Sequence, residues 1–284
     1  MRKDSRYMIV SAVIATFNRP RHLALCLKSI AASSVLPSEV LVADDGSTGE
    51  TLECVVRMQK TFGHLFPIVH VRQEHQGCRK QMIVNEAVRR SKGDYVFFTD
   101  GDCIVHRHCI RTHLERSDAR TILAGQRVQI GEEFTEKLLA GGDAVNTLTA
   151  GLLWDFVRRR SHHGQEAFIL RNGLLRRLLK KDRIKPATSV IGCNCSLPKE
   201  LFLAINGYDE DFQGFGDEDA DLGIRVLNSG GSIRSVRNLA IVYHLHHPGT
   251  WNMGTDQFKH NAMIKKRRIE NKEAFCRNGI RRIP

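Results

Sequence analysis

The sequence predicts an α/β fold: one large domain in which a mainly parallel sheet is flanked by helices. Two observations support this prediction. Short apolar runs rich in β-branched residues alternate with amphipathic segments along the first hundred residues, which is the pattern of repeated βα units. Polar side chains follow three of these apolar runs, as expected if parallel strands end at one ligand-binding edge. A chain of 284 residues is long enough to bury a sizeable core.

The expected elements alternate from the N-terminus onward. The first run, "MIVSAVIAT", is short and dense in β-branched residues, so it predicts a buried strand. Leu23, Leu27 and Ile30 then recur at helical spacing. Further strands are expected within 39–48, 67–73 and 94–103, with helices at about 50–61 and 79–93 between them.

Similar elements return in the second half of the chain. Residues 189–212 predict a strand, a turn and a helix. Residues 217–231 predict another helix, entered through the flexible turn "GFG". The segment "NLAIVYHLHH" (238–247) predicts a late strand that ends in histidines.

The basic charge of the chain lies in two segments. The whole chain has a formal net charge of +12, and residues 151–185 and 259–284 each contribute +7. The remainder is therefore nearly neutral. We expect a basic helical insert at 126–186 and a basic, helical C-terminal tail at 251–284.

Part of the insert has an apolar helical face. Leu174, Leu175, Leu178 and Leu179 fall on that face, with arginine and lysine beside it. A helix of this kind suits the surface of an anionic membrane. A solvated helix packed on the body of the protein is the alternative, and the sequence leaves both open.

Nothing in the sequence predicts export or a membrane span. No apolar run approaches the roughly 18–20 residues that cross a bilayer. The N-terminal apolar run is interrupted by polar residues and lacks a small-residue cleavage site, so it predicts a strand rather than a signal peptide. Eight scattered cysteines without a CxxC pair suggest a reducing compartment. We expect a cytoplasmic protein, peripheral on the inner face of the cytoplasmic membrane where it contacts lipid.

Asp100 and Asp102 end the fourth predicted strand in "TDGDC". Side-chain direction repeats every second residue of a strand, so both carboxylates point the same way. Two hard oxygen ligands suit Mn²⁺ or Mg²⁺, whose coordination a nucleotide diphosphate would complete. A polar cap at a strand-to-turn junction is the alternative, because Asp-Gly is common in turns.

Polar side chains also follow the first two strands. Asn18 and Arg19 follow the first, and Asp44 and Asp45 follow the second. Ligands of such sheets bind beyond the carboxyl ends of the strands, where these groups and Asp100 would converge. For the aspartate pair, a simple turn and a carboxylate that binds a base or ribose are both open.

Seven carboxylates stand within the fifteen residues of "YDEDFQGFGDEDADL". Like charges this close repel, so the cluster indicates a cation site, a proton-transfer group or a solvated loop. A calcium loop is disfavoured because Ala220 stands where an EF-hand has its bidentate glutamate. The start of a helix explains Asp217 and Asp221, since acidic side chains are favoured at the positive end of the helix dipole. It does not explain Glu218 and Asp219.

The late strand ends with His244, His246 and His247. A histidine at a strand end is more often a structural hydrogen-bonding group than a metal ligand. Two aspartates alone would leave a metal short of protein ligands, however. Imidazole would also favour Mn²⁺ over Mg²⁺.

Together these segments resemble a family 2 glycosyltransferase with the GT-A fold, over about 8–110 and 187–250. The first part matches through "ATFNRP", "VADDGS", "GCRKQMIVNEA" and "TDGDC". The second part, from "GCNCSLPKELF" to "DEDADLGIRV", is similar to the acceptor half of β1,4-galactosyltransferases and bacterial chondroitin-type polymerases. Phe215 stands where that signature often has tryptophan, so we expect the aromatic lid over the sugar to be weaker or to select differently.

The resemblance implies an inverting transfer from a UDP-sugar donor. A hexose or N-acetylhexosamine would pass to a hydroxyl of a glycan or lipid-linked glycan, in the synthesis of a cell-envelope polysaccharide or lipopolysaccharide. Residues 1–125 would form the nucleotide-sugar-binding half and residues 187–250 the acceptor and catalytic half.

The resemblance also implies roles for individual residues. Asp219 would be the general base, with Glu218 beside it on the sugar. Asp102 and His244 would hold Mn²⁺ or Mg²⁺. The residues implied for the nucleotide sugar are Thr16, Asn18, Arg19, Asp44, Asp45, Arg79, Asn85 and Asp100. Those implied for the acceptor or donor sugar are Asn194, Phe215 and Gly216.

Two other function classes are alternatives to this interpretation. A non-catalytic protein that binds polyanions or nucleic acid would explain the basic segments. The sequence contains no helix-turn-helix or RNA-stacking motif, however, and only 7% aromatic residues, so we expect no nucleic-acid partner. A sugar-nucleotide pyrophosphorylase would need a Gly-rich, Arg-containing loop after the first strand, and the sequence has none there.

Overall fold

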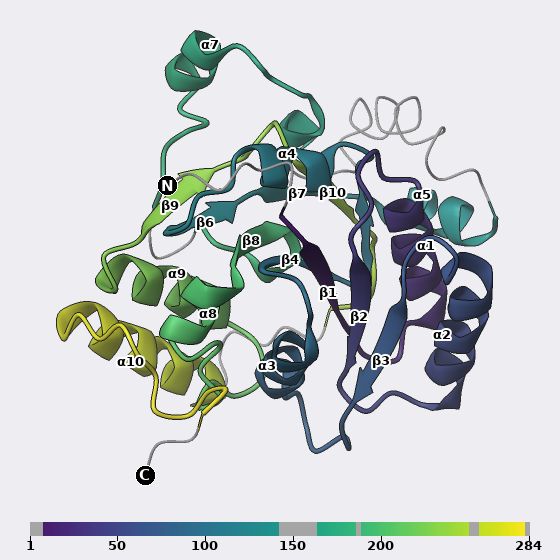
Figure 1. Cartoon of the computed structure of the whole chain (residues 1–284), viewed down its shortest axis with the longest axis horizontal. Helices are drawn as coiled ribbons and strands as arrows, with labels where there is room; N and C mark the ends of the chain where they lie inside the picture. The colour runs from purple at the N-terminus through teal and green to yellow at the C-terminus, as the bar shows by residue number, and fades with distance from the viewer. Residues whose placement is uncertain (1–7, 142–163, 186–188, 250–255, 282–284) are drawn as a thin grey trace.

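A computed structural model describes residues 8–141, 164–185, 189–249 and 256–281 (Figure 1). Most of the basic stretch "LLWDFVRRRSHHGQ" lies outside these described residues. Within them, no helix combines the length and apolarity that crossing a membrane requires.

A seven-stranded sheet runs through the centre of the described chain, with helices on both faces (Figure 1). Its strands, in spatial order, are β3 (Ile68–Arg72), β2 (Glu39–Asp44), β1 (Val10–Thr16), β4 (Tyr95–Asp100), β8 (Cys195–Pro198), β6 (Thr121–Ala124) and β9 (Ser232–Ser235). Of these seven, only β8 runs antiparallel to its neighbours. The predicted α/β class with a mainly parallel sheet is confirmed.

Two apolar cores lie between the sheet and its helices. The α-helices within the described residues are α1 (Pro20–Ala31), α2 (Gly49–Phe62), α3 (Lys80–Arg90), α4 (Cys109–Glu115), α5 (Glu132–Leu139), α7 (Gly173–Leu178), α8 (Lys199–Ala204), α9 (Glu218–Asn228) and α10 (Asp256–Glu270). Ala12 and Ile14 of β1 face the core made with α1 and α2, whereas Val13 faces the core made with α3, α8 and α9. Alternate side chains of β1 therefore anchor the strand in both cores, and this holds its carboxyl end in place.

A second, three-stranded sheet brings the late strand to the acidic strand end. It consists of β5 (Cys103–Val105), β10 (Ile241–His244) and β7 (Gln126–Gln129), with β10 in the middle. The antiparallel register of β10 and β5 pairs His244 with Cys103. The backbone N–H of Leu245 also donates to the carbonyl of Asp102 at 2.9 Å. Strand pairing therefore places the histidines beside Asp102.

Two segments contain features that the sequence did not predict. The expected helical insert at 126–186 begins with strand β7, whose Val128 is fully buried in the core under the second sheet. The expected tail contains α10, which packs on α9 and buries the side chain of Arg268. The pattern did not show this burial because an arginine normally marks an exposed position.

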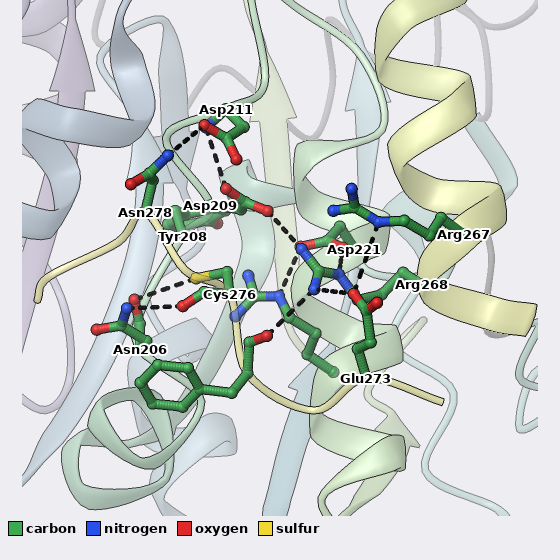
Figure 2. Close-up of polar contacts among 12 residues, drawn as sticks. Asn206, Tyr208, Asp209, Asp211, Asp221, Arg267, Arg268, Glu273, Cys276 and Asn278 are labelled. Atoms are coloured by element: carbon green, nitrogen blue, oxygen red, sulfur yellow. Dashed lines mark hydrogen bonds and ion pairs between the residues drawn. The ribbon is translucent and has the colours of Figure 1, made fainter. Parts of the chain in front are cut away.

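Ion pairs explain why Arg268 is buried and why the acidic stretch stays folded (Figure 2). Its guanidinium lies 2.5 Å from Asp209, 3.0 Å from Asp221 and 2.7 Å from Glu273. Arg225 holds the other oxygen of Asp221 at 2.6 Å. Asp209 and Asp221 are thus structural carboxylates, and α10 is an integral part of the fold.

Candidate active site

A cavity of about 760 Å³ lies at the carboxyl ends of β1 and β4. Its walls come from these strand ends, from the segment after β10 and from the start of α9. Asp102, His244, Glu218 and Asp219 all line this one cavity, although they are far apart in the sequence. The described chain therefore gathers potential metal ligands and a carboxylate pair around a shared space.

Three side chains in the cavity form a potential metal-binding set. One carboxylate oxygen of Asp102 and one ring nitrogen each of His244 and His247 all lie within 4.8 Å of one another. Nε2 of His247 is 3.2 Å from Oδ2 of Asp102, and Nε2 of His244 is 3.5 Å from Oδ1. A mixed oxygen and nitrogen donor set suits Mn²⁺ better than Mg²⁺. These residues could hold a divalent metal ion.

The charge state of Asp102 also suits a cation ligand. Burial by itself would raise the pKa of Asp102. The neighbouring His247, His244 and Arg19 outweigh burial and hold the pKa of that carboxyl well below its usual range. Nη1 of Arg19 lies 3.0 Å from Oδ2 of Asp102. The carboxylate is therefore ionised at neutral pH.

Asp219 is held by two hydrogen bonds at the first turn of α9. The backbone N–H of Gly192 donates to its Oδ2 at 2.6 Å, and the hydroxyl of Tyr208 donates to its Oδ1 at 3.0 Å. A Cβ atom at position 192 would lie 2.5 Å from Oδ1, so this approach requires glycine. The carboxylate has a fixed orientation in the cavity.

Glu218 is buried beside Asp219. Its Oε2 accepts the backbone N–H of Gly216 at 2.7 Å, in a turn where Gly216 has φ +112°. Burial, and then repulsion from Asp219, raise the pKa of Glu218 to about 7, while Lys80 opposes the rise. Two adjacent carboxyl groups in one cavity therefore differ in environment, as acid–base sites often do.

Lys80 supplies positive charge to the same cavity. Its Nζ lies 3.0 Å from Oδ1 of Asp100. Burial disfavours the ammonium form, but Asp100, Asp219 and Glu218 outweigh burial and raise the pKa of Lys80 well above its usual value. Lys80 is charged and is held between the strand end and the carboxylate pair.

Polar and aromatic groups line the part of the cavity formed after β1. The rings of Phe17 and His75 stack with centroids 4.4 Å apart and an interplanar angle of 14°. Nδ1 of His75 is 2.9 Å from the carbonyl oxygen of Asp45. The hydroxyl of Thr16 is buried and has no hydrogen-bond partner within the described part of the chain. This wall offers flat surfaces and an unused polar group to a ligand.

The sequence model of the family described as Glycosyl transferase family 2 matches residues 11–192. This span is more than half of the chain. The chain belongs to glycosyltransferase family 2. A second family model, described as the N-terminal domain of galactosyltransferase, matches residues 173–248. The predicted resemblance is confirmed on both parts of the chain.

Similar proteins cover nearly all of this family 2 chain. The chondroitin synthase of Escherichia coli is 27% identical over 252 residues, which are 86% of this chain and 35% of that protein. The hyaluronan synthase of Pasteurella multocida is 24% identical over 264 residues, 89% of this chain and 26% of that protein. The chain thus spans about a quarter to a third of the length of these relatives.

A solved structure with a similar fold is GalNAc-T7 with UDP, GalNAc and Mn²⁺. It superposes with a TM-score of 0.63 at 15% identity, and the match covers 93% of this chain and 48% of that chain. At this identity the likeness concerns the fold. The expected GT-A fold is confirmed.

Most of the residues expected at the site of this family 2 chain line the cavity. They are Thr16, Asn18, Arg19, Asp45, Asp100, Asp102, Phe215, Glu218, Asp219 and His244. Phe215 is 44% exposed and lines both this cavity and a neighbouring one of about 510 Å³.

Three expected residues are directed into the protein instead. Oδ1 of Asp44 accepts the N–H of Ser47, and its Oδ2 is 2.8 Å from His70. The amide of Asn85 bonds the backbone N–H and carbonyl of Tyr208. Placing Asp44 and Asn85 on the nucleotide sugar was therefore wrong.

The third of these residues is Asn194, which was expected to contact a sugar. It is fully buried, and its Nδ2 donates to the carbonyls of Gln126 and Ala240. It ties the first sheet to the second. A role in binding sugar is wrong for Asn194, because no part of its side chain reaches the cavity.

Arg79 and Gly216 contribute through backbone groups. The N–H of Arg79 donates to Oδ2 of Asp45 at 2.9 Å, and its guanidinium turns to the carbonyl of Glu74 and lines the neighbouring cavity. Gly216 bonds Glu218 and does not line the main cavity. In the described structure these two residues position Asp45 and Glu218, and their expected contacts with a ligand remain predictions.

Several cavity residues were missed by the sequence prediction. His247 stood among three candidate histidines, and only the strand register shows that it reaches Asp102. Lys80 follows Arg79 directly, and the start of α3 decides which of the two enters the cavity. Gly192 carried no signal of its own, because its use depends on Asp219, which is distant in the sequence.

We expect the replacement Glu218→Gln to stabilise the fold at pH 8 but not at pH 4.5. The pKa of Glu218 is about 7 in the fold against 4.5 for the free group. The folded state therefore holds the proton more tightly, and stability is lost as the pH rises from 4.5 through 7. Glutamine does not titrate, so it avoids a cost of about 3 kcal/mol at pH 8.

Urea unfolding of both proteins in metal-free buffer measures this difference. The variant should exceed the wild type in free energy of unfolding at pH 8, with the gap closing toward pH 4.5. An equal gap at both pH values would show that Glu218 does not carry a raised pKa.

Proposed function

We propose that the protein transfers a hexose or N-acetylhexosamine from a UDP-sugar to a hydroxyl of a glycan acceptor, with inversion at the anomeric carbon. One observation carries this proposal: a single cavity holds a potential Mn²⁺ site and a fixed carboxylate pair. The names of the relatives, a chondroitin synthase and a hyaluronan synthase, support a role in polysaccharide synthesis. GalNAc-T7, which was solved with UDP and Mn²⁺, supports the choice of donor.

The donor diphosphate belongs beside Asp102 in this proposal. Asp102, His244 and His247 would hold Mn²⁺, which when bound neutralises charge on a departing diphosphate. Arg19 and Lys80 line the same cavity and add positive charge for the phosphates.

The nucleoside belongs beyond the end of β1. Asp45 and Thr16 offer hydrogen-bonding groups there, and the stacked Phe17 and His75 offer flat surfaces to a base. Asn18, which lines the same wall, also donates its backbone N–H to Ser47 and thereby fixes the turn after β1.

Asp219 is the general base in this proposal. The acceptor oxygen forms a bond to the anomeric carbon, the bond from that carbon to the diphosphate oxygen breaks, and the hydroxyl proton passes to Asp219. A single displacement of this kind inverts the anomeric centre. Gly192 and Tyr208 each bond one carboxylate oxygen, and the remaining lone pairs are free to accept the proton. Glu218 lies beside the reacting groups and orients a sugar hydroxyl.

A screen of UDP-sugars tests the proposed function. The purified full chain is incubated with single UDP-hexoses and UDP-N-acetylhexosamines, with Mn²⁺ or with EDTA, and UDP release is measured with and without oligosaccharide acceptors. With Mn²⁺ present we expect UDP release from one class of donor, and with EDTA we expect no release. If no UDP-sugar binds or reacts in the presence of Mn²⁺, the proposal is overturned.

A further inference from the structure

Helix α7 buries Arg176 and exposes its leucines, which is the reverse of an ordinary surface helix. Arg176 on its inner face is 4% exposed. On its outer face Leu174 and Leu178 are 69% and 68% exposed, and Leu179 is 53% exposed. A surface helix normally buries its leucines and exposes its arginines. Packing within the fold therefore does not explain why leucines occupy the outer face of α7.

Polar contacts fix this orientation. Nη2 of Arg176 lies 2.5 Å from Oδ1 of Asp182 and donates to the carbonyl of Ser235, and its Nη1 donates to the carbonyl of Arg237. Oδ1 of Asn172 caps the helix by accepting the N–H of Leu175 at 3.1 Å. The arginine anchor holds the leucines outward.

Basic side chains surround the exposed leucines. We define the α7 patch as Leu174, Leu175, Leu178 and Leu179 together with the exposed Arg171, Arg177, Lys180, Arg183 and Lys185. Figure 1 shows α7 projecting from the body of the protein at the upper left. Exposed apolar clusters on a folded protein mark interaction sites.

We propose that the α7 patch docks the protein on an anionic lipid bilayer. Aliphatic side chains flanked by lysine and arginine enter the boundary between headgroups and acyl chains, while the cations pair with anionic headgroups. The helix carries no aromatic side chain of the kind that stacks on single-stranded nucleic acid. The projecting helix is also suited to a surface rather than to a groove. This proposal does not depend on the proposed sugar transfer.

Vesicle sedimentation with the full chain tests the proposal. Phosphatidylcholine vesicles with and without phosphatidylglycerol are used at low and high salt. We expect binding to the anionic vesicles, weakened by salt. The double replacement Leu174→Ser with Leu178→Ser should lower the partition coefficient at least about tenfold. The matched control replaces Leu52 and Val56 by serine on α2, where they are 50% and 40% exposed, and should leave binding unchanged.

Other outcomes would overturn the proposal. One is an equal lowering of the partition coefficient by both serine pairs, and another is equal binding to both kinds of vesicle. A third is a dimer on size exclusion that the α7 variant loses, which would assign the patch to a second copy. Displacement of bound protein from vesicles by a short nucleic acid would assign the patch to a polyanion. Circular dichroism of each variant tests whether the fold is intact, so that a loss of binding can be assigned to the replaced side chains.

Discussion

The replacement Asp219→Asn should reduce sugar transfer by about 10²–10⁴-fold while leaving UDP and Mn²⁺ binding intact. Asparagine keeps the size of the side chain, and its amide oxygen can still accept the N–H of Gly192. Its NH₂ group can donate to the hydroxyl of Tyr208, whose oxygen also accepts. The geometry is kept, and the ability to take a proton is lost. Initial rates at saturating donor, together with UDP titrations, separate the two effects.

Asp217→Asn is the matched control for this experiment. Asp217 stands two residues earlier, pairs with Lys265 at 2.5 Å and does not line the cavity. Transfer by this variant should stay within about twofold of the wild type. Normal transfer by Asp219→Asn, or an equal loss in the control, would remove Asp219 from the role of base.

The replacement Arg268→Ala should lower the free energy of unfolding by about 3–5 kcal/mol. Arg268 is 2% exposed and is paired with Asp209 and Asp221, which are 1% and 0% exposed. Alanine would leave Asp209 buried without its cation and Asp221 with Arg225 alone. Removing one partner of a buried network leaves an uncompensated charge, which costs more than the pair contributes. Urea unfolding followed by circular dichroism measures the loss.

The adjacent Arg267 provides the control. Its side chain is 55% exposed and lies 3.7 Å from Glu273. Arg267→Ala should cost no more than about 1 kcal/mol, as for other exposed ion pairs. Similar losses in the two variants would mean that the buried network shown in Figure 2 does not hold α10 to the fold.

The layout of the sheet could be predicted because its signals are local. β-Branched runs and helical spacing mark β1 to β4 and the helices between them. The carboxyl ends of parallel strands must share an edge, so Asp45 and Asp102 could be expected to meet. The acidic start of α9 was also visible, because Glu218 and Asp219 follow a glycine turn that needs positive φ.

The remaining features depend on contacts between distant segments. Whether an asparagine such as Asn194 faces the cavity or the core is decided by which carbonyls surround it, and these come from β7 and the loop before β10. The burial of Arg268 depends on carboxylates about fifty positions earlier in the chain. The selection of His247 depends on the register of β10. Sequence spacing does not encode any of these pairings.

One titration tests the central claim that metal binding and proton transfer are separate tasks of a shared cavity. UDP is titrated, with and without Mn²⁺, into the wild type, Asp102→Ala and Asp219→Asn. The account predicts that Mn²⁺ strengthens UDP binding to the wild type and Asp219→Asn but not to Asp102→Ala. Undiminished Mn²⁺-dependent affinity in Asp102→Ala would contradict it.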